Sequence, residues 1–286
     1  MLSVVVAPIV AQVAQAPISE RTMLSERIDV LAHNVRIRTG GELGIVIWDM
    51  ETDVLFERNS DQAFPLAGLV RLAVALTAYR QVDARTLHLD TPIADAPDRI
   101  TVRDALARSL SQNDRAATDA LYRAVGGTDA IDAALRAAGF DGMLVRTDEA
   151  GLAADAQAQR SFARGGDNAG SPAAVALLLT ELARGEILSD RSRRAFLHAL
   201  LHTTGRHVGL AAGLPQGTKL AQIRGKSPRY NGVRDALNDA GIAQINGRNV
   251  VIVAMLSHAR GTQAQLDAIL ASVARTAWAA SADVIP

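Results

Sequence analysis

The chain has 286 residues, with 30 basic and 30 acidic side chains and no cysteine. This length is sufficient for a large hydrophobic core. The absence of cysteine excludes disulfides, a thiolate nucleophile, and zinc or iron–sulfur sites with cysteine ligands. Because the charges cancel, no overall field attracts nucleic acid, and we expect no nucleic-acid partner.

The N-terminal residues 1–16 form an apolar run that ends in Ala14-Gln15-Ala16, the small-x-small pattern of a signal-peptidase site. No lysine or arginine precedes the run. It predicts a signal peptide, with a periplasmic or secreted protein if it is cleaved and a cytoplasmic one otherwise. The run is too short to span a bilayer, and no later segment is apolar for long enough, so we expect no membrane span.

Strand patterns occur near both ends of the chain, with helical patterns between them. Expected strands are Leu43–Asp49, Val54–Arg58, Thr218–Ile223, Gly241–Ile245 and Asn249–Ser257. Expected helices are Glu20–Val35, Leu66–Arg80, Val102–Leu110, Arg115–Val125, Asp129–Ala138, Pro172–Arg184 and Ala264–Ala279. This order predicts an α/β (α+β) fold, in which residues 17–62 and 212–286 form an antiparallel sheet flanked by the terminal helices. Residues 63–211 are predicted to form an inserted all-helical domain.

Four segments, in order, resemble the class A β-lactamase and penicillin-binding-protein family. Phe64 to Ala75 lies where that family has its S-x-x-K box at a helix start. Thr101 to Gly127 resembles the helix, S-D-N loop and helix that follow. Glu149 to Ala153 resembles the E-x-x-L-N box, and Leu214 to Gly225 resembles the approach to the K-T-G strand. The resemblance implies the β-lactamase fold.

The residues that carry the chemistry differ from those the resemblance implies. Gly68 stands at the place of the nucleophilic serine, and Arg71, which stays protonated, stands at the place of the box lysine. The S-D-N box becomes Asn113, Asp114 and Arg115. In the K-T-G box, lysine becomes Ile223 and threonine becomes Arg224. Covalent acyl transfer at this position is therefore excluded, whereas Glu149 retains the carboxylate that activates water in the family.

The candidate site consists of Glu149 as the catalytic group and of Gly68, Arg71, Asn113, Asp114, Arg115 and Arg224 as binding residues. If the family geometry holds, Arg71, Arg115 and Arg224 converge, and three buried guanidiniums require anions. The leading hypothesis is a pseudoenzyme that binds a small anionic molecule or a peptide in the former cleft. A second is a non-covalent hydrolase, lyase or isomerase with Glu149 as general acid or base. A third is a role in interactions at another surface. Against ligand binding stands a plugged, inert core in which Glu149 and Asp114 neutralise two of the arginines.

Other candidates carry weaker signals. His198 and His202 lie four residues apart on a helix, with His207 nearby, but no carboxylate completes a zinc-binding set. Ser109 and Ser111 have no lysine or histidine in predictable reach, and we expect them to shape the end of a helix. We therefore predict no metal and no cofactor, and we expect a monomer.

Overall fold

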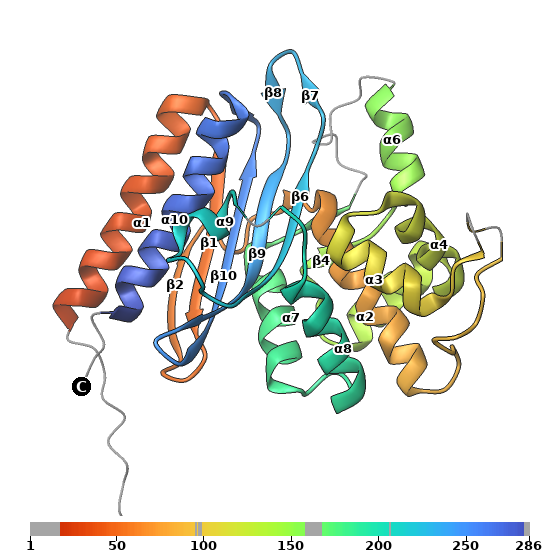
Figure 1. Cartoon of the computed structure of the whole chain (residues 1–286). Helices are drawn as coiled ribbons and strands as arrows, with labels where there is room; N and C mark the ends of the chain where they lie inside the picture. Colours follow the sequence, from red (N-terminus) through yellow and green to blue (C-terminus); the bar gives the residue numbers. More distant parts are fainter. Residues whose placement is uncertain (1–17, 95, 97–98, 158–167, 206, 283–286) are drawn as a thin grey trace, which may run out of the picture.

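The computed structural model describes residues 18–94, 96, 99–157, 168–205 and 207–282. Its centre is an antiparallel sheet with the strand order β2-β1-β10-β9-β6 (Figure 1). The strands are β1 (Glu42–Asp49), β2 (Val54–Arg58), β6 (Leu220–Lys226), β9 (Leu237–Ile245) and β10 (Arg248–Ser257). Both ends of the chain supply these strands, so the predicted sheet is confirmed. β6 and β9 each extend beyond the predicted bounds.

Strand β10 lies at the middle of the sheet, and its residues from Val250 to Ser257 are all buried. It pairs with β1 from Glu42↔Ser257 to Asp49↔Val250, and with β9 on its other side. Because both faces of the sheet are covered, the strand reads as a continuous apolar run rather than an alternating one.

One face of the sheet is covered by α1 (Ile18–Thr39), α9 (Leu210–Gly213) and α10 (Gln263–Ala282) (Figure 1). Leu24, Ile28 and Val35 of α1 pack into a hydrophobic cluster with side chains of the sheet and of α10. The terminal helices therefore form one layer, as the sequence predicted.

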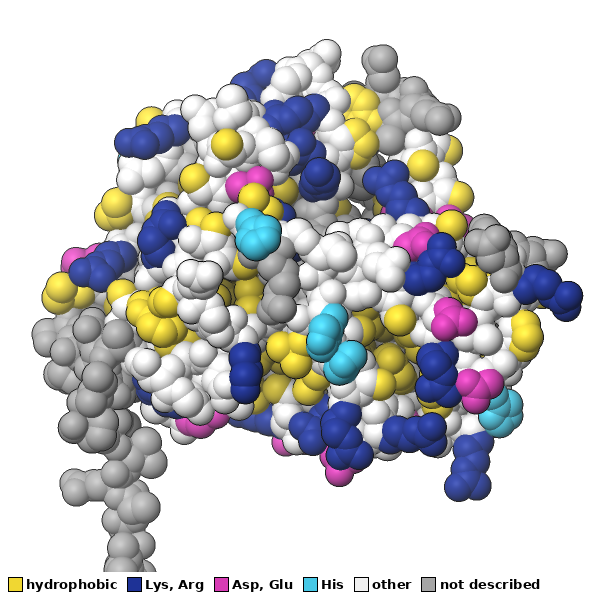
Figure 2. All heavy atoms as spheres, in the orientation of Figure 1, with side chains coloured by type: hydrophobic (Ala, Val, Ile, Leu, Met, Phe, Trp, Pro, Cys, Tyr) yellow, Lys and Arg dark blue, Asp and Glu magenta, His cyan; other side chains and the backbone are white. Residues whose placement is uncertain are grey.

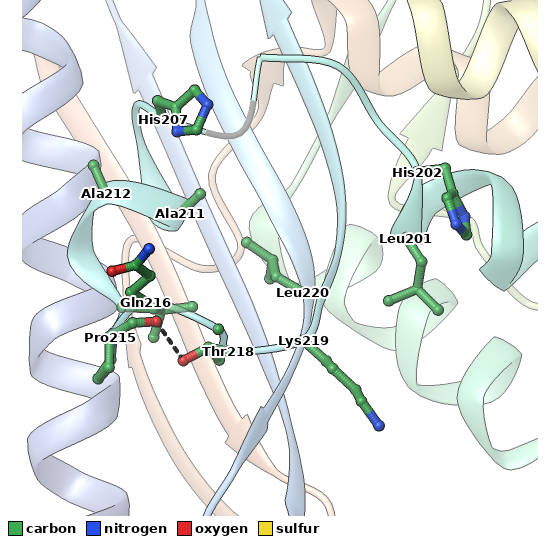
Figure 3. Close-up of a pocket in the computed structure, with 12 residues that line it drawn as sticks. Leu201, His202, His207, Ala211, Ala212, Pro215, Gln216, Thr218, Lys219 and Leu220 are labelled. Atoms are coloured by element: carbon green, nitrogen blue, oxygen red, sulfur yellow. Dashed lines mark hydrogen bonds between the residues drawn. The ribbon is translucent and has the colours of Figure 1, made fainter.

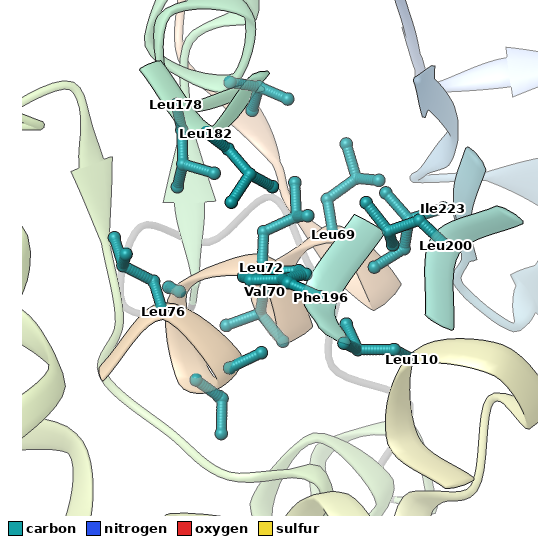
Figure 4. Packing of buried hydrophobic residues seen from close by; sticks show 14 of the residues in the cluster. Leu69, Val70, Leu72, Leu76, Leu110, Leu178, Leu182, Phe196, Leu200 and Ile223 are labelled. Atoms are coloured by element: carbon teal, nitrogen blue, oxygen red, sulfur yellow. The ribbon is translucent and has the colours of Figure 1, made fainter. Parts of the chain in front are cut away.

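The other face of the sheet contacts the helical part of the chain through a second hydrophobic cluster, which also includes Val251 and Val253 of β10. At its centre is α2 (Val70–Asp83), in which every residue from Val70 to Tyr79 is buried. Figure 4 shows Leu72 and Phe196 packed together in this cluster, with Ile223 of the sheet close by. A helix buried on all sides, as this one is apart from its last residues, is typical of such a central position.

The helices around α2 are α3 (Val102–Gln112), α4 (Arg115–Val125), α5 (Gly127–Ala137), α6 (Glu149–Gln157), α7 (Pro172–Arg184) and α8 (Asp190–Leu201). Short strands complete the fold: β3 (Phe64–Pro65), β4 (Met143–Leu144), β5 (Ala169–Gly170), β7 (Arg229–Tyr230), β8 (Val233–Arg234) and β11 (Ala259–Arg260). The predicted bounds of α4 and α7 are confirmed. The helix predicted from Leu66 begins at Val70 instead, after a 3-10 turn, η1 (Ala67–Leu69).

The predicted signal peptide, residues 1–16, lies outside the described residues. Among the residues described, no helix has the length and apolar character needed to cross a membrane. The domain boundaries stay a prediction, because the cluster around α2 runs from the helices into the sheet without a break.

Candidate functional site

The centre of the candidate site is a contact between η1 and the edge strand β6. A Cβ atom built on Gly68 would lie 2.5 Å from the carbonyl oxygen of Arg224 and 2.8 Å from the Cα atom of Gly225. In the reverse direction, a Cβ atom on Gly225 would lie 2.3 Å from the backbone nitrogen of Gly68. Each glycine therefore permits the backbone of the other segment to approach, and a side chain at residue 68 would collide with β6.

Asn238 of β9 fixes the chain just before this contact. It lies opposite Gly225 in the sheet and is fully buried. Its Nδ2 donates hydrogen bonds to the carbonyl oxygens of Pro65 and Leu66, at 2.7 and 2.9 Å. The next residue, Ala67, adopts a left-handed conformation with φ 44°, which turns the chain into η1. Sequence reasoning missed Asn238, because its role depends on a contact across more than 170 residues.

Arg71, in the first turn of α2, fills the space beside Gly68. Its Nη2 atom lies 3.0 Å from the position of a Cβ atom on Gly68. Its Nη1 donates to Oδ1 of Asn113, the left-handed residue that ends α3. The side chain is only 7% exposed, and burial lowers the pKa of Arg71, although the nearby Glu149 carboxylate opposes this effect.

Glu149, at the start of α6, lies between two arginines. Its Oε1 is 3.5 Å from Nε of Arg71, and its Oε2 is 3.6 Å from Nε of Arg115. The Glu149 side chain is 6% exposed, whereas that of Arg115 is 60% exposed. The backbone N–H of Glu149 donates to Asp119 Oδ1 at 2.8 Å, which fixes the start of the helix. Both carboxylate oxygens therefore face guanidinium groups.

The space left in the site has a volume of about 30 Å³, roughly that of one water molecule. The residues around it are Ala67, Gly68, Arg71, Arg115, Glu149, Leu152, Ala153, Lys226 and Pro228. Lys226 was not among the predicted site residues. It follows Gly225 on β6, so the position of the K-T-G box was the signal that could have found it.

The expectation that Arg224 converges with Arg71 and Arg115 is wrong. Arg224 Nε lies 3.0 Å from Oδ2 of Asp239 on β9, and its Nη2 lies 2.6 Å from Oδ1 of Asp267 on α10. Successive strand residues point to opposite faces. Since Ile223 packs into the cluster around α2, the Arg224 side chain emerges on the α10 face.

Asp114 does not neutralise the site arginines either. It caps the N-terminus of α4, where it accepts a hydrogen bond from the Ala117 N–H at 3.0 Å. It also forms an ion pair with Arg108, at 2.6 Å. Burial alone would raise the pKa of Asp114, but these hydrogen bonds hold it below its usual range. The plugged-core hypothesis paired Asp114 with one of the three site arginines. That pairing is wrong, because Asp114 pairs with Arg108.

Asp239 is completely buried behind Arg224. It accepts hydrogen bonds from Gln222 Nε2 at 2.7 and 2.9 Å and from the Leu210 N–H at 2.9 Å. Burial raises the pKa of Asp239 to about 7, against the opposing effect of Arg224 and of these hydrogen bonds. Sequence reasoning missed this group because Leu210, Gln222 and Asp239 meet only in the folded chain.

The histidines lie beside a different pocket, with a volume of about 700 Å³ (Figure 3). The rings of His198 and His202 stack with centroids 4.1 Å apart. His207 lies on the opposite side of the pocket from His202. Figure 2 shows hydrophobic side chains around the histidines on this face. The described part of the chain contains no group of three or more metal-binding side chains.

The two serines have structural contacts. Ser109 is fully buried and shares a hydrogen bond with Thr118 at 2.9 Å. Ser111 Oγ donates to the carbonyl oxygen of Ala107 within α3 at 2.6 Å. Both contacts agree with the expected role of these serines at the end of a helix.

Comparisons with known proteins show which family this chain resembles in sequence and structure. A model described as the beta-lactamase enzyme family matches residues 23–281. Relatives include the extended-spectrum beta-lactamase PER-1 of Pseudomonas aeruginosa, 26% identical over 93% of this chain and 88% of that protein. Beta-lactamase L2 of Stenotrophomonas maltophilia is 28% identical over 83% of this chain and 80% of its own. A solved beta-lactamase from Chitinophaga pinensis superposes with a TM-score of 0.80 at 26% identity, covering 92% of this chain and 99% of that one.

Replacing Arg71 with glutamine should cost about 3 to 5 kcal/mol of unfolding free energy, because it leaves the buried Glu149 carboxylate without its buried partner. The same change at Arg115 should cost less than about 1 kcal/mol, because that guanidinium is largely exposed. Urea denaturation of both variants and the parent measures the difference. Equal losses in the two variants would contradict the assignment of Arg71 as the main counter-charge.

Asp239 should make stability fall as the pH rises from about 4 to about 7. The unfolded chain loses this proton near the ordinary aspartate value, whereas the folded chain holds it to about pH 7. Relative to an Asp239→Asn variant, the parent should lose up to about 4 kcal/mol over that range. Chemical denaturation of both proteins at several pH values tests this, and parallel stability curves would refute it.

Proposed function

This chain belongs to the beta-lactamase enzyme family, but from its candidate site we propose that it is a pseudoenzyme that binds an anionic ligand instead of hydrolysing β-lactams. The observation that carries the proposal is the space at Gly68. A side chain there would begin 2.5 Å from a backbone oxygen of β6. Residue 68, which the resemblance assigns to the nucleophile, therefore has no reactive side-chain atom, and β6 leaves no room for a side chain there.

Two further features support the loss of acyl transfer. A nucleophilic hydroxyl must lose its proton to an adjacent base. Arg71 cannot accept a proton under ordinary conditions, and its guanidinium occupies the space beside Gly68. On β6, Ile223 is buried in the core, and Arg224 forms ion pairs on the far face of the sheet. Neither residue offers the cation or the hydroxyl that the resemblance implies for holding a substrate carboxylate.

The same contacts weigh against Glu149 as a general acid or base. A general base must reach the proton that it removes, directly or through one water molecule. Both Glu149 oxygens face arginines, at 3.5 and 3.6 Å, and the adjoining space is only about 30 Å³. This geometry favours ligand binding or a closed core over non-covalent catalysis.

The ligand part of the proposal rests on the cations at the mouth of the site. Arg115 is 60% exposed, and Lys226 lines the same small cavity. Since the cavity is too small to enclose a whole anion, we propose that these cations hold a small anion, or the carboxylate of a larger molecule or peptide, at its mouth. Bidentate pairing with an arginine would hold such a group.

No covalent adduct should form with a penicillin, because Gly68 has no side chain to be acylated. Intact-mass spectrometry after incubation with benzylpenicillin measures this directly. An added mass equal to that of the penicillin, located by peptide mapping to the site, would overturn the proposal.

Restoring a serine and a lysine together, as Gly68→Ser with Arg71→Lys, should not restore hydrolysis. The new side chain collides with β6, so the variant should also lose about 1 to 3 kcal/mol of stability. Gly68→Ala is the matched control for the collision alone. Turnover of a chromogenic cephalosporin at about 10 per second, typical of an enzyme, would contradict the proposal.

A small anion should raise the melting temperature of the parent, because a ligand that binds only the native state stabilises it. Formate, acetate and phosphate are the first probes. Arg115→Gln should abolish the increase, whereas Arg103→Gln, at an exposed arginine paired with Asp90, should retain it. If no anion changes the melting temperature, or if Arg115→Gln responds like the parent, the site is a closed core without a ligand.

A further inference from the structure

Helix α1 carries an unusual row of exposed hydrophobic side chains. Among the described residues, four large hydrophobic side chains are strongly exposed, and three of them are Met23, Val30 and Ile37, at 52%, 59% and 71%. The fourth is Leu55 on β2, at 46%. A spacing of seven residues is close to two helical turns, so the three side chains lie on one face, about 10 Å apart along the axis.

This row does not hold α1 onto its own protein. Leu24, Ile28 and Val35 do so from the opposite face, where they are buried against the sheet and α10. Figure 1 shows α1 at the outer side of the layer that it forms with α10. A surface helix normally turns polar residues outward, whereas here an exposed apolar side chain recurs every two turns, with Glu26, Arg27, His33 and Asn34 between them.

A groove beside the row has a mixed lining, in which Arg38, Arg260 and Gln265 stand beside apolar side chains. It has a volume of about 410 Å³ and lies between α1 and α10. Leu31 and Val35 line it from α1, and Ala268 and Ile269 line it from α10. We call the row and this groove together the α1 face.

We infer that the α1 face is a contact between two copies of this chain, with their α1 helices antiparallel across a two-fold axis at Val30. Met23 and Ile37 are both seven residues from Val30. The axis therefore places Met23 against Ile37 of the partner subunit and Val30 against Val30 of the partner subunit. The same patch serves both copies, as a closed two-fold dimer requires.

The charges along α1 favour the antiparallel arrangement. The half before Val30 has a net charge of −1, because Glu20, Glu26 and Asp29 outnumber Arg21 and Arg27, and the half after it has a net charge of +2 from Arg36 and Arg38. An antiparallel pair places each acidic half beside a basic one and also opposes the two helix dipoles. Asp29 and Arg36 already form ion pairs with Arg58 and Glu42 of the same chain.

Glu26 lies next to the hydrophobic row and has His33 on the same flank. The two-fold axis brings Glu26 beside His33 of the partner subunit, because the two residues lie four before and three after Val30. The contact extends along about 20 Å of helix, at the small end of protein interfaces, so we expect a weak dimer that assembles at high concentration. This inference replaces the expectation of a monomer and does not depend on the ligand site.

Sedimentation velocity from micromolar to near-millimolar protein tests association. The parent should shift from monomer to dimer, and Val30→Glu should remain monomeric because two like charges would meet on the axis. Leu55→Glu, at the exposed hydrophobic residue on β2, is the matched control and should dimerise like the parent. A monomeric parent throughout this range, or a Val30→Glu variant that dimerises as well as the parent, would refute the inference.

The absence of cysteine permits a direct test of the geometry. Under mild oxidation, Val30→Cys should form a disulfide-linked dimer, because its two copies meet on the axis. Ile37→Cys alone should not, but an equal mixture of Ile37→Cys and Met23→Cys should form a mixed dimer. Efficient cross-linking of Ile37→Cys by itself would overturn the antiparallel arrangement.

A lipid surface is the competing occupant of an apolar helix face. Binding of the parent to vesicles of anionic phospholipid, lost in Val30→Glu while the parent remains monomeric, would assign the face to a membrane and overturn the inference. Because all of these variants leave Arg71, Arg115 and Glu149 unchanged, the result is independent of the outcome at the ligand site.

Discussion

The approach of two backbones at Gly68 and Gly225 is the constraint around which the candidate site is arranged. Neither residue can carry a Cβ atom without a collision, so the start of the central helix lies directly on the edge strand of the sheet. Asn238 maintains this distance through hydrogen bonds to the two carbonyl groups before η1. With the backbones in contact, a side chain at residue 68 has no room beside β6.

Charge is balanced separately on the two faces of the sheet. On the α2 face, Glu149 lies between Arg71 and Arg115, and on the α10 face Arg224 forms an ion pair with Asp267 and contacts the buried Asp239. A buried guanidinium requires an anion, and here Arg71 finds one in Glu149 and Arg224 finds one in Asp267. The proposed binding of an anion therefore rests on the exposed Arg115 and on Lys226, not on three converging arginines.

The site retains only about the volume of one water molecule, so a larger partner, if one binds, would contact the surface instead. The layer formed by α1 and α10 is a candidate for this, because α1 has apolar side chains on both of its faces. The inner ones hold the helix on the sheet, and the outer ones are left for another molecule. The proposed ligand site and the α1 face therefore lie on opposite sides of the central sheet.

The sequence by itself determined the fold class, most of the helices and strands, and the absence of a hydroxyl at residue 68 and of a lysine at residue 71. These follow from local periodicity and from residue identity, which need no knowledge of distant contacts. It also identified Glu149 as the carboxylate of the site. Only the tertiary structure decided that Arg224 faces α10, that Asp114 pairs with Arg108, and that Gly68 touches β6. Those outcomes depend on strand orientation and on backbone distances between segments far apart in the chain, and a difference of one strand residue reverses the face on which a side chain lies.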